Sequence, residues 1–278
     1  MTFATNLLPI FLAGLLWTAT STATPTNVIP SCYDLVDVDQ VPPPVKRGLL
    51  VVVDNTIEFD HALQKESFEK IVRFMNEGDR VVIVSFSAYV KDQYTRIRAD
   101  ARLDRMLSED AAFTVPKRKL KELNRCLNGQ KRSLERVVGT ALEAIYAESS
   151  NDLPNTELVA TLAKTSREIL PTLEAAETYL LIVSDMMEHS DVTSFYQAGS
   201  IRTIDPEAEM QKVETSGVDA VYPGTVVYVI GAGYTATGKY RSAKVMRAVG
   251  EFWRQYVERA GGHLKTFGTP SMFGDIGR

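Results

Sequence analysis

A run of five apolar residues, mostly β-branched, occupies positions 49–53 and ends in Asp54. Such a run predicts a central parallel strand that is buried on both faces. Oxygen-bearing side chains follow at every second position, namely Thr56, Glu58 and Asp60. Because open α/β sheets bind ligands beyond the carboxyl ends of their strands, these oxygens are candidate ligands for a hard cation such as Mg²⁺. The alternative interpretation is an acidic polar loop without a ligand.

Apolar segments with strand and helix periodicity alternate along most of the chain. Residues 88–97 alternate in polarity and follow the preceding strand too closely for a crossover helix, so they predict an antiparallel edge strand. Further buried strands are predicted at 81–86, 179–183, 225–230 and 263–267. We therefore predict an α/β fold: a doubly wound, mostly parallel sheet with one antiparallel edge strand and helices on both faces.

Three helical segments bear on the predicted site. Apolar residues at a spacing of 3.6 run through positions 134–145, with Ser133 at the N-cap position of the helix that they predict. Another helix is expected over 156–175, with Pro171 kinking it or ending it early. Residues 117–136 hold eight Lys or Arg and two Glu. This basic segment is interpreted either as a docking patch for an anionic partner or, as is more common, as a solvated helix face.

The amino terminus differs from the rest of the chain. The first 23 residues carry no charged side chain and hold an apolar run at 7–19 that is too short to span a bilayer comfortably. With the small residues at 21–23, this predicts a cleaved signal peptide at 1–23 and a periplasmic or secreted protein without a membrane span. An N-terminal membrane anchor and a mis-assigned start codon are the alternatives.

The remaining chain divides into a proline-rich lead-in at 24–47, one domain at 48–268 and a C-terminal tail at 269–278. Cys32 and Cys126 are the two cysteines, and in an oxidising compartment they could pair. Cys126 could equally be a small buried residue. The formal net charge of -4 argues against nucleic acid as the main partner.

Two predicted strands end in aspartate, at Asp54 and Asp185, and a helix is predicted to begin after Ser133. This arrangement resembles the von Willebrand factor type A (vWA) family with its metal-ion-dependent adhesion site, over about residues 48–268. Asp54 matches the first Asp of the family's Asp-x-Ser-x-Ser motif, Thr56 replaces the first Ser, and Glu58 stands at the second Ser. Residues 184–190 and 193–196 resemble a bacterial branch of the family.

The resemblance implies a metal site formed by Asp54, Thr56, Glu58, Ser133 and Asp185, with Mg²⁺ or Mn²⁺ as cofactor. It also implies a protein partner and no catalysis. For the position that the family fills with Thr, the pair Gly139-Thr140 is the alternative to Ser133. The Glu at position 58 either adds a charged ligand or fills the place of a partner's carboxylate, and in a degenerate site no cofactor binds.

Two enzyme classes compete with this interpretation. Asp54-Asn55-Thr56 also resembles the loop of haloacid-dehalogenase-like Mg²⁺-dependent phosphohydrolases, in which Asp54 would be the nucleophile. The second Asp of that loop is absent, and no Gly-Asp-x-x-x-Asp pattern follows Asp185. The residues 231–236 resemble a dinucleotide-binding fingerprint, but no further βαβ strand with a terminal acid follows, so we interpret them as a tight turn. A structural module with a degenerate metal site is the third possibility.

Overall fold

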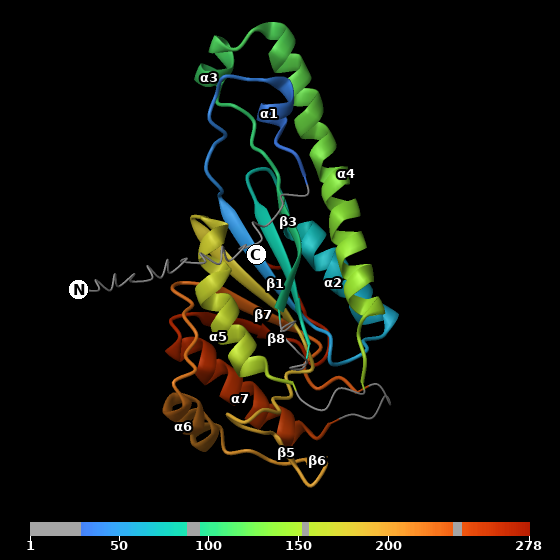
Figure 1. The fold of residues 1–278 in the computed structure, drawn as a ribbon, viewed down its shortest axis with the longest axis vertical. Coiled ribbons are helices and arrows are strands. Elements are labelled where there is room, and N and C mark those ends of the chain that lie inside the picture. Colours follow the sequence, from blue (N-terminus) through green and yellow to red (C-terminus); the bar gives the residue numbers. More distant parts are fainter. Residues whose placement is uncertain (1–28, 88–94, 152–155, 236–240) are drawn as a thin grey trace, which may run out of the picture.

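The computed structural model describes residues 29–87, 95–151, 156–235 and 241–278, and the predicted signal peptide lies outside them. Its centre is a six-stranded sheet with the strand order β3-β2-β1-β4-β7-β8 (Figure 1). The strands are β1 (Arg47–Asp54), β2 (Arg80–Phe86), β3 (Thr95–Arg102), β4 (Glu177–Val183), β7 (Val226–Ile230) and β8 (His263–Phe267). All neighbouring strands pair in parallel except β2 and β3. The predicted doubly wound sheet with one antiparallel edge strand, as in vWA and Rossmann-like folds, is confirmed.

Helices cover both faces of this sheet. Those on the sheet are α2 (His61–Phe74), α4 (Lys117–Ala147), α5 (Leu158–Glu168), α6 (Pro206–Ser216) and α7 (Ala243–Arg259), whereas α1 (Cys32–Val36) and α3 (Glu109–Thr114) lie beyond it. A 3₁₀ turn (Leu170–Leu173) follows α5, and the two-residue strands β5 (Tyr196–Gln197) and β6 (Ser200–Ile201) form a small hairpin. No helix in the described part of the chain is long and apolar enough to cross a membrane.

Successive side chains of β1 point to opposite faces of the sheet, and each face carries its own layer of helices. Leu50 and Val52 belong to the apolar core shared with α5, α6 and α7, whereas Leu49, Val51 and Val53 belong to the core shared with α2 and α4. All five side chains are fully buried. A strand that is buried on both faces must lie in the middle of a covered sheet, and β1 does.

The long helix α4 corrects one sequence-based prediction. A helix was expected to begin after Ser133, but α4 runs without a break from residue 117 to residue 147, and Ser133 lies in its middle. The buried stripe continues on the amino-terminal side of Ser133 through Leu123, Leu127 and Gln130. Since the apolar face is continuous, there is no point at which a new helix would begin.

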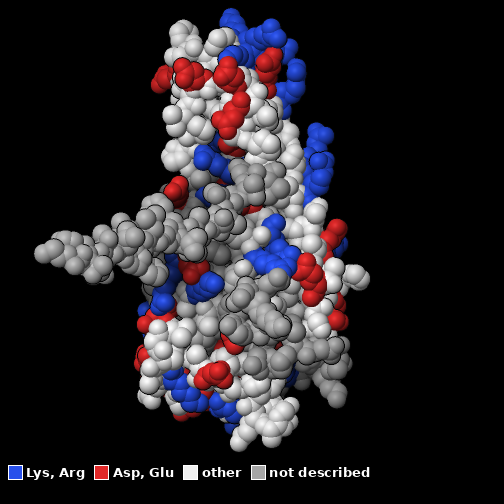
Figure 2. Space-filling view, in the orientation of Figure 1, with Lys and Arg blue, Asp and Glu red and all other residues white. Residues whose placement is uncertain are grey.

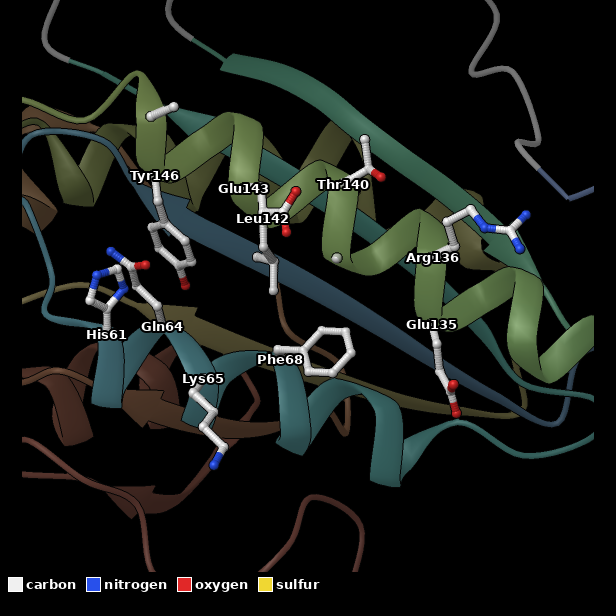
Figure 3. A pocket seen from close by; sticks show the side chains of 12 residues that line it. His61, Gln64, Lys65, Phe68, Glu135, Arg136, Thr140, Leu142, Glu143 and Tyr146 are labelled. Atoms are coloured by element: carbon white, nitrogen blue, oxygen red, sulfur yellow. The ribbon is translucent and has the colours of Figure 1, made fainter.

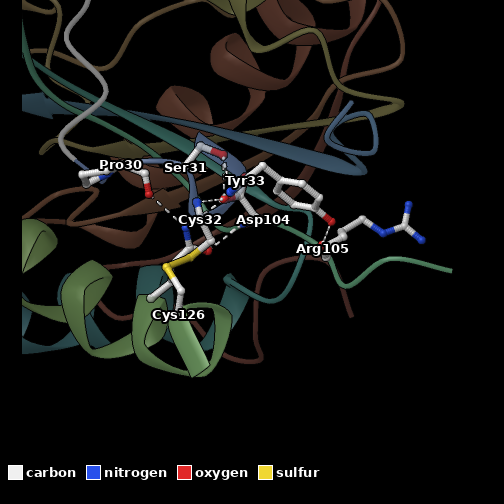
Figure 4. Close-up of a disulfide and its surroundings, with 8 residues drawn as sticks. Pro30, Ser31, Cys32, Tyr33, Asp104, Arg105 and Cys126 are labelled. Carbon is white, nitrogen blue, oxygen red and sulfur yellow. Dashed lines mark hydrogen bonds between the residues drawn. A yellow bond between two sulfur atoms is a disulfide. The ribbon is translucent and has the colours of Figure 1, made fainter. Parts of the chain in front are cut away.

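The first half of α4 projects beyond the sheet and carries a small core of its own. We call this part the tip; it consists of residues 29–40 and 104–130 and includes α1 and α3 (Figure 1). A disulfide joins Cys32 to Cys126, with their Cα atoms 5.7 Å apart (Figure 4). The buried carboxylate of Asp104 accepts hydrogen bonds from the Cys32 backbone N–H at 2.7 Å and from the Gln130 side chain at 3.0 Å.

Other boundaries differ from the predictions for local reasons. The edge strand was predicted over 88–97, whereas β3 begins at Thr95, and residues 88–94 lie outside the described residues. The helix predicted over 156–175 is divided into α5 and the 3₁₀ turn, with Pro171 in the first turn of the latter. Proline fixes φ and lacks an N–H, which is compatible with a new turn but not with a continuing helix.

Candidate functional site

Asp54 ends β1 at the carboxyl edge of the sheet, and its side chain is completely buried. One carboxylate oxygen accepts hydrogen bonds from the Thr56 backbone N–H at 2.8 Å and from the Thr56 hydroxyl at 2.6 Å. The other oxygen accepts a hydrogen bond from the Ser184 hydroxyl at 2.7 Å. Burial raises the pKa of Asp54 above its ordinary value, while these hydrogen bonds act in the opposite direction.

Thr156 supplies a further hydroxyl that the sequence interpretation did not assign to the site. Its Oγ1 lies 2.8 Å from the Oγ1 of Thr56. Thr156 precedes α5 and is held there by two backbone hydrogen bonds with His189, at 3.0 and 3.1 Å. His189 itself lies with Nδ1 2.8 Å from the hydroxyl of Ser194. The sequence signal for Thr156 is a hydroxyl residue at the start of the helix that was predicted over 156–175.

Asp185 lies one residue beyond Ser184, at the end of the neighbouring strand β4. Its Oδ1 accepts a hydrogen bond from the Met187 N–H at 3.0 Å, and its Oδ2 lies 3.3 Å from Nη2 of Arg241. The side chain of Asp185 is buried, and this burial together with the negative charge of Asp54 raises the pKa of Asp185 to about 7. The predicted meeting of two carboxylates at this edge therefore has a measurable electrostatic consequence.

Arg241 is the cationic group beside this pair. Its Nη2 also lies 3.4 Å from the carbonyl oxygen of Tyr234, while its buried Nε has no hydrogen-bond partner within the described residues. Tyr196 lies close enough that the charge of Asp185, after burial, raises the pKa of the Tyr196 hydroxyl to about 12. Two buried carboxylates thus face one guanidinium, which offsets their negative charge only in part.

The structure does not bring Glu58 and Ser133 to Asp54. The side chain of Glu58 is exposed, and its backbone N–H donates to the Asn151 side chain at 3.0 Å. Ser133 lies 14 residues before the end of α4, which is about 21 Å along the helix axis from the end nearest to the site. Thr140, the alternative to Ser133, is exposed on the same helix. The mid-helix position explains why neither hydroxyl reaches the carboxyl edge.

The donors that do converge fit a hard cation. Two carboxylates and the hydroxyls of Thr56, Thr156 and Ser184 are the oxygen ligands that Mg²⁺ and Mn²⁺ accept. Burial, and after it the negative charge of Asp54, raises the pKa of Asp185, and a cation near both carboxylates would favour their charged forms. Within the described residues no group of three or more His, Cys, Asp or Glu side chains is arranged to hold a metal. A cation here would therefore depend on the hydroxyl oxygens.

The glycine-rich turn after β7 packs against the residues that carry the site and is hydrogen-bonded to Asp185. Gly231 and Gly233 have φ angles of 98° and 73°, and a Cβ at Gly231 would lie 2.7 Å from the Phe59 ring. The Gly231 N–H donates to Pro270, and the Gly233 N–H donates to the carbonyl oxygen of Asp185. Because these amides already bond to protein oxygens, the turn positions Asp185 and does not present its amides to a dinucleotide phosphate.

A groove lies between α2 and α4, apart from the two carboxylates. This groove of about 870 Å³ has an apolar floor formed by Phe68, Leu142 and Tyr146 (Figure 3). Gly139 leaves room above Phe68, since a Cβ at this position would lie 3.7 Å from the ring. The rim carries charges of both signs, including Lys65, Glu135, Arg136 and Glu143, and so does not select a ligand by charge.

Comparisons with known proteins leave the family open. No family model matches the chain, and no curated protein matches it. Among solved structures, proximal thread matrix protein 1 from the mussel byssus is 12% identical over 76% of this chain and 48% of its own, with a TM-score of 0.33. An aerotolerance-related membrane protein from Bacteroides fragilis is 11% identical over 80% and 92%, with a TM-score of 0.33. The type V pili tip protein Mfa5 from Porphyromonas gingivalis is 17% identical over 71% and 30%, with a TM-score of 0.28. None of these likenesses assigns a function.

Proposed function

We propose that this chain is an exported vWA-like binding module that holds a protein partner at the carboxyl edge of its sheet through a divalent cation. Asp54, Asp185, Thr56 and Thr156 would hold the cation, and Glu58 and Ser133 would not. The observation that carries the proposal is the buried pair of carboxylates from adjacent strands, with hydroxyls converging on Asp54. The cation would offset both negative charges and bind an oxygen atom of the partner.

Arg241 would regulate access to this site. Its guanidinium is the positive charge beside Asp185, so a divalent cation would compete with it for the same carboxylate. Binding would then require the Arg241 side chain to move away from Asp185. Exchange of the guanidinium for a divalent cation would replace one positive charge by two, so Asp185 would keep a cationic partner and the large cost of a buried unpaired charge would be avoided.

The phosphohydrolase alternative is less well supported by the geometry. An aspartate nucleophile must present a free oxygen to phosphorus. Both oxygens of Asp54 accept hydrogen bonds, and at position 56 a Thr bonded to Asp54 stands in place of the second Asp of the phosphohydrolase loop. We therefore propose binding without catalysis.

Calorimetric titration with Mg²⁺ and Mn²⁺ tests the proposal on wild type, Asp185→Asn and Thr156→Val. We expect cation binding to the wild type, a loss of at least about tenfold in affinity for either variant, and an equal loss of partner binding. Asp219→Asn, an exposed carboxylate on another surface, should bind as the wild type does. Asp185→Asn should also unfold at a higher denaturant concentration without metal, because the two carboxylates no longer repel.

Two results would contradict the proposal. Phosphatase activity that disappears in Asp54→Asn would establish the enzyme instead. If neither ion binds to the wild type nor to a variant that lacks Arg241, the site is degenerate and the module is purely structural.

A further inference from the structure

Seven exposed cations form a line along the outer side of α4. We call this line the basic ridge; it consists of Lys117, Arg118, Lys121, Arg125, Lys131, Arg132 and Arg136. The ridge covers 19 helical steps, or about 28 Å. In Figure 2 the Lys and Arg atoms follow the right-hand edge of the upper half of the molecule, over the helix labelled α4 in Figure 1. The ridge is therefore a protruding edge and not the lining of a cleft.

The charges of the ridge are largely uncompensated. Arg118 forms an ion pair with Glu122 at 3.2 Å, whereas the other six cations form no ion pair with any described residue. Lys119, which is not part of the ridge, is paired with Asp37. The chain as a whole has a net charge of -4, so this edge opposes the overall charge of the protein. An approaching anion is therefore attracted to this edge although the protein as a whole is negatively charged.

The ridge does not stabilise the helix that carries it. Lys117 and Lys121, Lys121 and Arg125, and Arg132 and Arg136 are like charges four residues apart, a spacing at which they repel. The first turn of α4 contains Lys117 and Arg118 and no acidic residue, although the positive end of the helix dipole favours acids there. Apart from the i,i+4 ion pair of Arg118 with Glu122, the helix gains no ion pair with a described residue from these charges, which favours a role toward an external partner.

The shape and chemistry of the ridge favour a planar partner. None of the large apolar side chains of α4 is exposed, so the ridge offers neither an aromatic platform for bases nor an apolar seam for a partner helix. A plane can meet a protruding edge along its whole length, and long Lys and Arg side chains on either side of that edge can bend toward it. A flexible polyanion would have to be straightened along the row at a cost in conformational entropy.

We propose that the basic ridge docks the protein onto an anionic lipid bilayer, through headgroup phosphates and without insertion into the hydrocarbon. Clusters of four to eight Lys or Arg on a helix surface bind anionic lipids in this way. The first turn of α3 is acidic, and α3 lies across the tip from α4 in Figure 1, on the side where Figure 2 shows Asp and Glu atoms. The molecule would therefore meet the bilayer edge-on, with the acidic side of the tip turned away. This proposal is independent of the cation site.

Co-sedimentation with vesicles tests the proposal on the full chain. The probes are phosphatidylcholine vesicles with and without one-third phosphatidylglycerol, at low and high salt. We expect binding only to the anionic vesicles and release by high salt, since screening shortens the reach of surface charges. The variant Lys121→Gln/Arg125→Gln/Arg132→Gln should bind about 100-fold more weakly, because each cation near such a surface contributes about fivefold.

A matched control removes three exposed cations elsewhere. Lys164→Gln/Lys244→Gln/Arg254→Gln changes the net charge equally on α5 and α7 and should retain wild-type binding. Thermal unfolding of both triple variants verifies that each is folded. Equal binding to neutral and anionic vesicles would overturn the proposal, as would equal losses in the two triple variants. Retention on heparin or duplex DNA without binding to anionic vesicles would identify a soluble polyanion instead and would also overturn it.

Discussion

At the scale of single residues, the carboxyl edge combines three charged groups whose charges do not cancel. Asp54 and Asp185 follow adjacent strands. Of these two carboxylates, Arg241 forms an ion pair only with Asp185. The pKa of Asp185, raised to about 7, is the expected result of burial next to a second carboxylate. Under the proposed function, Arg241 would stabilise the site when no divalent cation is present and would compete with one when it is.

Arg241→Gln tests both roles at once. Without metal we expect the variant to lose about 1–3 kcal/mol of unfolding free energy, because a buried carboxylate loses its charged partner. With saturating Mg²⁺ the loss should disappear, and the affinity for Mg²⁺ should exceed that of the wild type. Denaturant unfolding with and without Mg²⁺ measures both effects. Arg247→Gln, an exposed position on α7, is the control, and an unchanged Mg²⁺ affinity in Arg241→Gln would exclude competition.

Glu188 is a second buried carboxylate, and its role is structural. It is completely buried; one oxygen accepts a hydrogen bond from the Val159 N–H at 2.9 Å, in the first turn of α5. The other oxygen has no hydrogen-bond partner among the described residues. Burial raises the pKa of Glu188 from its ordinary 4.5 to about 8. The folded protein therefore holds a proton on Glu188 that the unfolded chain releases at lower pH.

This difference predicts a decline of stability with rising pH. Between about pH 4.5 and pH 8 the folded state binds more protons at Glu188 than the unfolded state does. The unfolding free energy should then fall by up to about 1.4 kcal/mol per pH unit from this group. Glu188→Gln, which imitates the protonated side chain, should make the decline shallower, and Asp185 accounts for part of what remains. Urea unfolding at four pH values measures this, and identical slopes for wild type and variant would contradict it.

At the scale of elements, α4 serves two different cores. Its second half packs on the sheet through Leu134, Val138 and Leu142, and its first half packs on α1 in the tip through Leu123 and Leu127. The tip holds few apolar residues, so its order depends on the disulfide and on the buried Asp104 carboxylate. A core of this size buries too little apolar surface to be stable by itself, so the disulfide matters more for the tip than for the core around the sheet.

The disulfide should therefore contribute strongly to stability. Cys32 and Cys126 are 94 positions apart, and closing a loop of that length is worth about 2–5 kcal/mol in the chain-entropy model. Cys32→Ser/Cys126→Ser should lower the unfolding free energy by about this amount and should loosen α1 before the sheet. Hydrogen exchange distinguishes the two regions. In the native wild type a thiol reagent should label neither cysteine before reduction, and labelling of both would contradict the pairing.

Several elements could be predicted from the sequence because their cause is local. The strand at 49–53 follows from a continuous apolar run, and the antiparallel edge pairing of β3 follows from a connection too short for a crossover helix. The final strand was predicted at the residues that form β8. The two aspartates at the carboxyl edge also followed, since strand order brings strand ends together. Ser133 was wrongly placed at a helix start, because a polar face hid the buried stripe that precedes it. Thr156 and Arg241 were missed because only the tertiary fold brings Thr156 to Thr56 and Arg241 to Asp185.

At the scale of the whole molecule, the carboxyl-terminal residues complete one of the two cores. The predicted tail at 269–278 packs against the α2 face of the sheet, with Met272 and Ile276 buried. The Met272 N–H donates to Glu66 at 2.7 Å, and Asp275 forms an ion pair with Lys70 at 3.7 Å. The apolar surface that covers α2 and β7 therefore includes residues far beyond the last strand.

Truncating one buried side chain in this segment tests whether the segment is packed into the core or only lies on the surface. Ile276→Ala should cost about 2–5 kcal/mol of unfolding free energy, because it leaves a cavity against the sheet. Phe273→Ala, three residues earlier, removes a larger side chain that is 91% exposed and should change stability by less than about 0.5 kcal/mol. Urea unfolding of the two variants measures the difference. Because the larger deletion is predicted to be harmless and the smaller one severe, equal effects would show that this segment does not belong to the folded core.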